Sequence, residues 1–189
     1  MTAGNGESRE LVMHNDFIIV GPADDPAGIG EAESAAAALA LISESEATFL
    51  SRGDESGTHT KELGLWTTAE IEPAGSWYQE TGQGMGATLT IASEKTAYTL
   101  TDRATYLANK GNFGLEILFE GDPALLNIYH VITVNPDKWP KLNYDGALAF
   151  AKFMIDSATQ DAIGKFGVDK FGQPLFFPDA DKTDADLGL

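Results

Sequence analysis

The apolar residues of this chain form short runs that alternate with longer amphipathic stretches. The short runs end in turn-forming residues such as Gly21-Pro22 and Asn135-Pro136, and they predict strands at residues 16–20, 47–50, 97–100 and 126–134. The amphipathic stretches predict helices at residues 31–42, 57–66, 85–95, 101–111, 145–157 and 159–167. A glycine- and aromatic-rich segment at 75–86 is expected to be an ordered loop. Strands that alternate with helices favour an α/β fold with a largely parallel sheet.

Large apolar side chains are expected to build the core. In the helix predicted at 145–157, the core candidates are Ala147, Leu148, Ala151, Phe153, Met154 and Ile155. Trp66, Trp77 and Trp139 are interpreted as core or lobe-surface residues rather than as a platform for sugar stacking, and a core position is favoured because large aromatic side chains bury well.

Composition narrows the classes of partner. The 189 residues hold 12 Lys and Arg against 29 Asp and Glu, a net charge of −17. Such a surface argues against nucleic acid and anionic membranes as partners, since both require clustered cations. No cysteine is present, which excludes disulfides and cysteine chemistry and leaves the compartment open. The first eight residues have neither a basic start nor an apolar run, so no signal peptide is expected.

The segment at 50–59 carries the clearest chemical pattern. A strand ends, a glycine-containing loop turns, and a helix begins with small hydroxyl residues. This arrangement directs backbone N–H groups and the positive end of a helix toward one spot, which suits an anion. Arg52 offers a planar guanidinium, Ser56 and Thr58 offer hydroxyl donors, and Gly57 allows close approach to the backbone. The simpler alternative is a helix capped by Asp54 or Ser56, with Arg52 in a surface ion pair.

Three rival interpretations of the same region are weaker. A serine hydrolase could use the loop at residues 53–57, but the spacing is not G-x-S-x-G and no histidine is assignable as a base. His14, His59 and His130 lack the paired spacing of zinc ligands, so no direct metal ligand is expected. The tripeptide Arg52-Gly53-Asp54 matches an integrin-type adhesion motif, but three residues recur by chance.

Several stretches resemble one family, the tungstate- and molybdate-binding proteins of ABC importers. They are FLSRGDESGTH at 49–59, VMHNDFIIVGP at 12–22, DDPAG at 24–28, WYQETGQGMG at 77–86, AYTLTDRATY at 97–106, and shorter matches at 127–129 and 166–167. The resemblance implies a two-lobed periplasmic-binding-protein-like α/β fold with mixed, mostly parallel sheets. It implies no enzymatic activity, no cofactor, and an extracytoplasmic protein that delivers tungstate or molybdate to the membrane subunit of an importer. A sensor or other non-transport module that binds anions is the alternative.

The resemblance also assigns residues and regions. By motif match, Arg52 clamps the oxyanion, while Ser56, Thr58 and the Gly57 amide donate hydrogen bonds. The implied regions are an N-terminal tail and hinge entry at 1–15, a ligand-binding lobe at 16–97, and a second crossing with part of the other lobe at 98–189. The family's usual N-terminal segment is not recognisable at residues 1–9, so the first lobe is expected to be incomplete. We therefore expect weak oxyanion binding by the chain alone, and self-association through apolar surface left uncovered at residues 115–134.

Overall fold

The computed structural model describes residues 3–188 and divides the chain into two compact units. The central unit is Asp16–Leu126, and the terminal unit comprises the described residues 3–15 and 127–188. The chain passes from one unit to the other twice, after Asn15 and after Leu126. Residues 98–126, which the sequence analysis placed with the other lobe, belong to the central unit because their two strands pair within its sheet.

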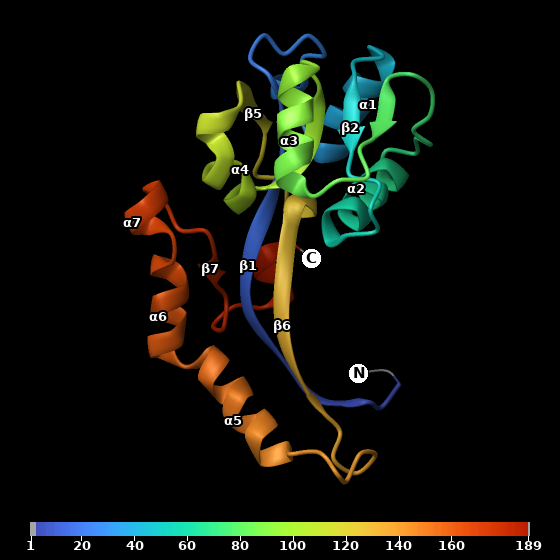
Figure 1. Cartoon of the computed structure of the whole chain (residues 1–189). Coiled ribbons are helices and arrows are strands. Elements are labelled where there is room, and N and C mark those ends of the chain that lie inside the picture. Colours follow the sequence, from blue (N-terminus) through green and yellow to red (C-terminus); the bar gives the residue numbers. More distant parts are fainter. Residues whose placement is uncertain (1–2, 189) are drawn as a thin grey trace. The chain divides into compact units, whose positions relative to one another are not determined.

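The central unit is built on a mixed sheet with the strand order β3-β2-β4-β1-β5. Figure 1 labels β1, β2 and β5 of this sheet. The strands are β1 (Gly6–Pro22, shared with the terminal unit), β2 (Phe49–Ser51), β3 (Tyr78–Glu80), β4 (Tyr98–Asp102) and β5 (Leu115–Phe119). The α-helices are α1 (Ala35–Glu44), α2 (Gly57–Thr68), α3 (Met85–Glu94) and α4 (Arg103–Asn109). Short 3-10 turns occupy Ile29–Glu31, Lys110–Asn112 and Pro123–Leu125. The expected mixed α/β fold is confirmed.

The sheet is less parallel than expected. β2 runs parallel to β3 and β4, whereas β1 runs antiparallel to both β4 and β5. The alternation of strands and helices predicts only the parallel pairs, which crossover helices connect. β1 pairs with strands more than 70 residues away, Ile18 lying opposite Thr101, and no local signal marks this pairing. The segment at 75–86, expected to be a loop, contains the edge strand β3.

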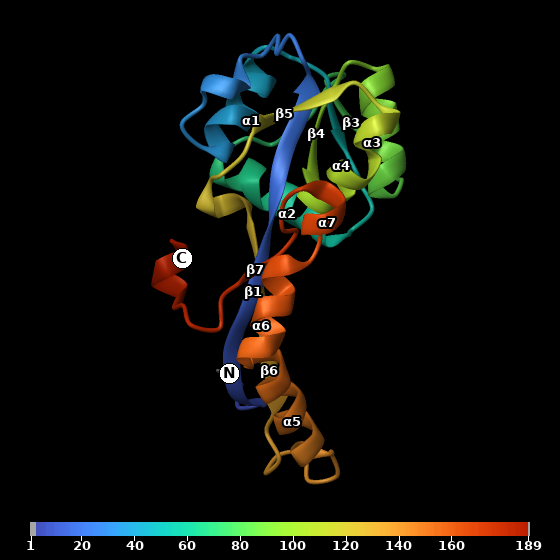
Figure 2. The ribbon, with the colours of Figure 1, turned by 90° about the vertical axis from the view of Figure 1, so that its left-hand side faces the viewer.

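The central sheet carries a core on each face. Phe17 and Ile19 of β1 belong to a cluster with α1 and α2, while Ile18 and Val20 belong to a cluster with α3 and α4. Figure 2 shows these helix pairs on opposite sides of the sheet. Successive side chains of a strand point to opposite faces, so a sheet covered on both sides needs an uninterrupted apolar run. Trp66 lies in the first cluster and is 1% exposed, as expected for a core residue.

The terminal unit contains the first part of β1 together with β6 (Leu126–Val134) and β7 (Phe177–Pro178), which both pair with β1. Its helices are α5 (Tyr144–Ile155), α6 (Ser157–Lys165) and α7 (Val168–Phe171), and a 3-10 turn lies at Asp184–Leu187. The Asp179 carboxylate is fully buried beside β1, where it contacts the His14 Nδ1 at 2.7 Å and the Lys182 Nζ at 2.9 Å. This cluster holds the segment after β7 against β1.

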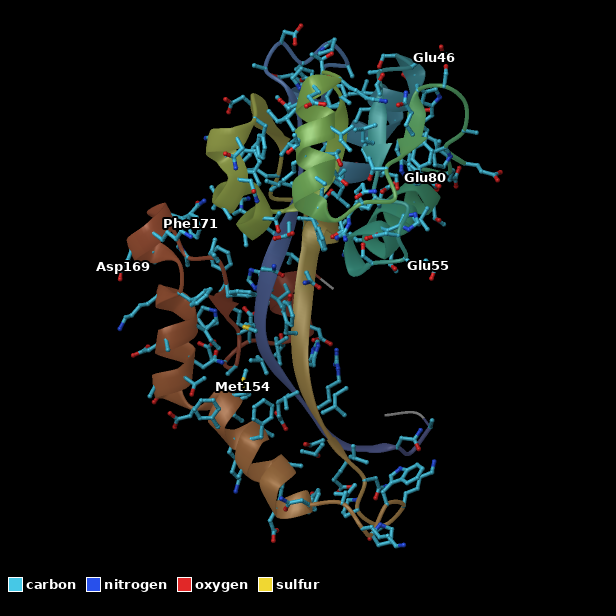
Figure 3. All side chains as sticks on the ribbon, in the orientation of Figure 1. Glu46, Glu55, Glu80, Met154, Asp169 and Phe171 are labelled. Carbon is cyan, nitrogen blue, oxygen red and sulfur yellow. The ribbon has the colours of Figure 1, made fainter. Side chains whose placement is uncertain are left out.

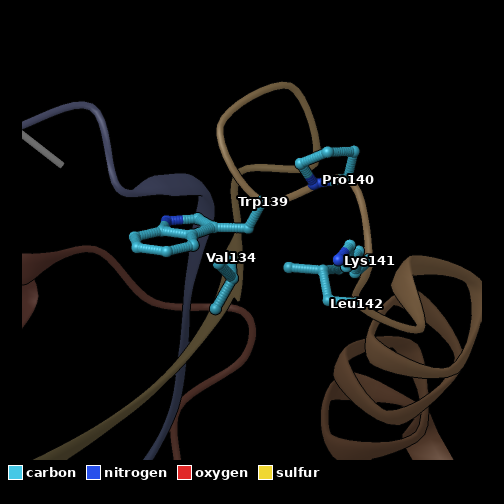
Figure 4. Close-up of a pocket in the computed structure, with 5 residues that line it drawn as sticks. All are labelled: Val134, Trp139, Pro140, Lys141 and Leu142. Atoms are coloured by element: carbon cyan, nitrogen blue, oxygen red, sulfur yellow. The ribbon is translucent and has the colours of Figure 1, made fainter.

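The terminal unit leaves much apolar surface uncovered. Both hydrophobic clusters lie in the central unit, whereas nine large apolar side chains of the terminal unit are at least 36% exposed. They are Tyr129, Ile132, Val134, Trp139, Phe150, Phe153, Phe166, Val168 and Phe177. Val134 and Trp139 line a shallow hollow of about 540 Å³ with Pro140, Lys141 and Leu142 (Figure 4). Trp139 is therefore a surface residue, which is the less favoured of the two expected positions, and not a core residue.

The α5 core assignment is also only partly right. Ala151 is buried, but Phe153 is 59% exposed. Helical periodicity identifies an apolar face without showing what covers it, and none of the described residues encloses Phe153.

Because the hydrophobic core lies in the central unit, truncation of an apolar side chain should destabilise the protein more there than in the terminal unit. Leu89→Ala removes a fully buried side chain and should lower the free energy of unfolding by about 2–5 kcal/mol. Phe153→Ala should change it by less than about 0.5 kcal/mol, because that ring is already largely in water. Urea unfolding followed by circular dichroism checks both variants. Equal losses would show that Phe153 is enclosed in solution.

Self-association through the exposed apolar side chains of the terminal unit remains a prediction, and it can be tested at Phe150 and Phe153. Light scattering should show a mass that rises with protein concentration, because exposed apolar patches favour association. Phe150→Ser with Phe153→Ser should shift the protein toward monomer. Leu63→Ser, at a 44% exposed site of the central unit, is the matched control. A wild-type monomer at all concentrations would contradict the prediction.

Candidate functional site: the edge where β2, β3 and β4 end

Three neighbouring parallel strands of the central sheet end at one edge. β2 ends at Ser51, β3 at Glu80 and β4 at Asp102, and the next helices α2, α3 and α4 begin within a few residues of these ends. Loops at the carboxyl ends of parallel strands are where α/β sheets place their ligands. This edge is therefore the candidate site, and the segment singled out in the sequence is its central loop.

The chain also enters and leaves the central unit at this edge. Phe17 of β1 lies opposite Asp102, so Asp16 is at the same end of the sheet. Lys61, on the second turn of α2, donates to the carbonyls of Ala124 and Leu126, each at 3.0 Å. The loops of the candidate site thus lie beside the two points at which the chain changes unit.

The loop between β2 and α2 has a constrained backbone. Gly53 has φ +57°, and a Cβ there would lie 2.8 Å from the Cβ of Glu80, so only glycine fits. Glu55 also adopts a left-handed conformation, with φ +58°, and its exposed side chain points away from the unit (Figure 3). The loop before α3 holds this segment, because Gly82 N–H donates to the Arg52 carbonyl at 2.9 Å.

The first turn of α2 presents unsatisfied N–H groups. The Ser56 hydroxyl accepts a hydrogen bond from His59 N–H at 3.3 Å and caps the helix. Among the hydrogen bonds of residues 3–188, none uses the N–H of Gly57 or Thr58. A Cβ on Gly57 would meet no atom within 4 Å, so no side chain packs against this position of the helix start. Free N–H groups and the positive end of a helix dipole favour an anion here.

Arg52 is the predicted cation of the loop, and the structure holds it close to the helix start. Its Nη2 donates to the Asp54 Oδ2 at 2.5 Å, and its side chain is 18% exposed. Its Nε is buried and has no hydrogen-bond partner within the described residues. A buried donor without a partner is costly, so this guanidinium retains an unused N–H for another acceptor.

Both features of the simpler interpretation are present. Ser56 caps α2, and Arg52 forms an ion pair with Asp54. Asp54 does not cap the helix itself but accepts a hydrogen bond from Ser56 N–H at 3.2 Å. Hydrogen bonding by the Ser56 side chain, then by its amide, and the charge of Arg52 lower the pKa of Asp54 below its ordinary value of 3.8. The cap and the anion-binding features occupy the same loop and are compatible.

Thr58 lies on α2 just inside the helix start and is 8% exposed. Arg52, Ser56, Gly57 and Thr58 therefore lie within one loop and one helical turn.

The second arginine at this edge is already paired. Arg103 binds Asp16 through Nε and Nη2 at 2.5–3.1 Å and also contacts Glu120. Hydrogen bonding by Asp16 raises the pKa of Arg103, which is thus a fixed cation with both partners already in place.

Glu62 is a central residue that the sequence analysis missed. It lies on α2, is 2% exposed, and accepts hydrogen bonds from Ser51 Oγ at 2.8 Å, Tyr78 OH at 2.8 Å and Trp66 Nε1 at 3.1 Å. Burial raises its pKa, against these hydrogen bonds, which lower it. Glu62 lies three and four positions before Leu65 and Trp66, which places it on the apolar face of the helix. This spacing was the only sign in the sequence that Glu62 would be buried.

The geometry does not support the rival chemistries. His59 Nδ1 accepts a hydrogen bond from Glu55 N–H at 3.1 Å, and no histidine ring contacts the Ser56 hydroxyl within the described residues. The same residues contain no cluster of three or more His, Cys, Asp or Glu side chains suited to a metal. No helix in residues 3–188 is long and apolar enough to cross a bilayer.

The chain is similar to proteins that are named as anion-binding proteins. The model of a PBP superfamily domain matches residues 2–158. The tungstate-binding protein TupA of Peptoclostridium acidaminophilum is 48% identical over 96% of this chain and 64% of its own length. A putative ABC transporter anion-binding protein of Haloferax volcanii is 50% identical over 94% of this chain and 53% of its own length.

A solved structure agrees with the sequence relatives. The tungstate-binding protein TupA from Desulfovibrio alaskensis G20 is 46% identical, with a TM-score of 0.83 over 95% of this chain and 73% of its own. The chain thus spans about two thirds or less of the length of the two sequence relatives. All three proteins are named for binding, and none of them as an enzyme.

The hydrogen bonds at Asp54 predict a specific pH response. We expect its carboxyl to titrate below 3.8, and Ser56→Ala to raise that pKa more than Arg52→Ala does, because the Ser56 side chain is the larger cause. The folded pKa lies below the unfolded one. The contribution to stability is thus present above the unfolded pKa and is lost as the pH falls through the folded value. Carbon-detected NMR titration of the carboxyl measures it, and a larger effect of Arg52→Ala would contradict the order.

Proposed function

Because the chain belongs to the PBP superfamily and, within it, to the family of the tungstate-binding proteins, we propose that it captures a tetrahedral oxyanion at the loop between β2 and α2. The relatives' names make tungstate the first candidate. Molybdate has the same charge and shape, and the donors of this loop do not distinguish the two. The metal of such an anion is already surrounded by oxygen, so the protein supplies hydrogen-bond donors rather than metal ligands.

The observation that carries the proposal is a set of unused donors at one place. The N–H groups of Gly57 and Thr58 lack partners among the described residues, and the buried Nε of Arg52 lacks one as well. An oxyanion presents only acceptors, so it satisfies donors of this kind. The guanidinium adds a planar fork that suits two oxygens of one anion.

Oxyanion capture by an acidic protein requires contacts of this short range. The net charge of −17 repels a dianion at a distance, and ions screen that repulsion beyond about 10 Å at 0.1 M salt. Fixed dipoles at a helix start and one nearby arginine act at contact distance, where screening by salt is weak. The selectivity for anions therefore resides in the loop and not in the overall field of the protein.

The names of the relatives also support a proposal for the partner and the compartment. One of them is named as an ABC transporter anion-binding protein, which supports an extracytoplasmic role in delivery to the membrane subunit of an importer. A sensor that binds the same anion without a transporter is the alternative. Binding of the loaded protein to importer-containing membranes would separate the two roles.

Arg52 is the residue that tests the proposed site. We expect tungstate to shift the amide resonances of Gly57 and Thr58 in an NMR titration, which also detects millimolar affinity. Arg52→Ala should weaken binding by about 2–3 kcal/mol, because a desolvated, charge-assisted contact is lost. Arg52→Lys should restore affinity only in part, since an ammonium group lacks the fork.

The matched control is Arg9→Ala, which removes the same charge from an exposed ion pair with Asp184 in the terminal unit. It should leave the tungstate titration unchanged. Titrations with molybdate, sulfate and phosphate establish which oxyanion the loop prefers. Wild-type affinity in Arg52→Ala would show that the site lies elsewhere in the chain.

A further inference from the structure

A buried carboxylate lies directly beneath the anion-binding loop. Glu62 is on α2, one turn after Thr58, and it accepts hydrogen bonds from Ser51, Tyr78 and Trp66. These partners come from the end of β2, the start of β3 and α2 itself. A negative charge so near a proposed oxyanion site opposes binding by electrostatic repulsion, so its presence there calls for a compensating role.

The direction of the Ser51 hydrogen bond depends on Glu62. An ionised carboxylate only accepts, so the Ser51 hydroxyl donates to Glu62 Oε2 at 2.8 Å. The lone pairs of the Ser51 Oγ are then free to accept, and Gly53 N–H donates to this atom at 3.2 Å. A hydrogen-bond relay therefore runs from the amide of Gly53 through Ser51 to Glu62.

This relay controls the part of the loop that presents Arg52. Gly53 has φ +57° and is packed against Glu80, so its amide has one well-defined direction. The Arg52 carbonyl accepts from Gly82 N–H, and the Gly53 N–H of the same peptide group donates to Ser51, so both polar ends of the Arg52–Gly53 peptide are held. The backbone of Arg52 is therefore held on one side by the loop before α3 and on the other by the relay.

We propose that Glu62 is a positioning residue for oxyanion binding, which acts through Ser51 to fix the backbone from which Arg52 reaches the anion. The inference rests on the proposed binding at this loop. The positioning role predicts that removal of the Glu62 charge weakens binding. Repulsion alone predicts the opposite, because removal of a nearby negative charge should strengthen the binding of a dianion. The direction in which tungstate affinity changes when the Glu62 charge is removed therefore separates positioning from repulsion. His59, on the same helix, is a titratable neighbour of Glu62.

The decisive variant is Glu62→Gln. The amide oxygen still accepts from Tyr78 and Trp66, but the NH₂ group donates toward Ser51 where the carboxylate accepted. The Ser51 hydrogen bond is then reversed, so the Ser51 hydroxyl no longer donates to a carboxylate, and its oxygen accepts from both the new side-chain amide and Gly53 N–H. We expect tungstate binding to weaken by on the order of tenfold, as for the loss of one charge-assisted hydrogen bond.

Ser51→Ala removes the middle of the relay and should weaken binding to a similar extent. The double variant Ser51→Ala with Glu62→Gln should bind no more weakly than either single variant, since both interrupt one relay. In the ligand-free protein, both single variants should shift the Gly53 amide resonance. Glu62→Gln should also shift the indole resonance of Trp66, which Ser51→Ala should leave in place.

Glu80→Gln is the control for charge. Glu80 is an exposed carboxylate at the end of β3, and its aliphatic part packs on Gly53 (Figure 3). Glutamine keeps that packing and removes the same charge, so binding should stay equal or become tighter. Thermal melting of each variant establishes that its fold is retained, and Ser51→Ala serves as the test if Glu62→Gln does not fold.

Three results would overturn the inference: equal or tighter tungstate binding by folded Glu62→Gln, independent losses that add in the double variant, or an unshifted Gly53 amide. Absence of tungstate-induced shifts in the wild-type chain would refute the proposed function instead. In that case the ligand-free shifts of Gly53 still report whether Glu62 orders the loop.

Discussion

The carboxylate of Glu62 is buried, and a buried carboxylate has to be hydrogen-bonded. The three donors that satisfy it join α2 to the end of β2 and the start of β3. This requirement determines how α2 sits on the sheet, and hence where its free N–H groups point. The aromatic packing around it, with Phe49 and Trp66 edge to face at 5.3 Å, excludes water and strengthens each of these hydrogen bonds.

The two arginines at this end of the central sheet differ in how fully their donors are paired. Arg103 is satisfied by Asp16 and Glu120 and reinforces the point where β1 enters the unit. Arg52 has one ion-pair partner, Asp54, and a buried Nε without a partner among residues 3–188. An anion that approaches this edge therefore meets one arginine with donor capacity to spare, next to a helix start with two free amides.

The loop of the site was predictable from sequence because every feature is local. A strand end, Arg52, a glycine and a run of Ser56, Gly57 and Thr58 fall within ten residues, which form one loop and the first turn of α2. The hydrogen bonds of Glu62 to Ser51 and Tyr78 were not predictable, since they join residues 11 and 16 positions apart through tertiary contacts.

Long-range pairing explains the other differences. The antiparallel position of β1 depends on strands far along the chain, and the second boundary, after Leu126, depends on where β5 pairs. Periodicity found α5 but could not show that Phe153 would remain exposed. The pattern of a helix reports its apolar face, whereas burial depends on what packs there.

The most direct test of the account is a crystal structure of the chain soaked in tungstate, with anomalous scattering used to locate the tungsten. A tungsten peak is expected between the guanidinium of Arg52 and the amides of Gly57 and Thr58, with the oxygens of the anion in hydrogen-bonding contact with those donors. A peak elsewhere on the chain, with this loop unliganded, would contradict it.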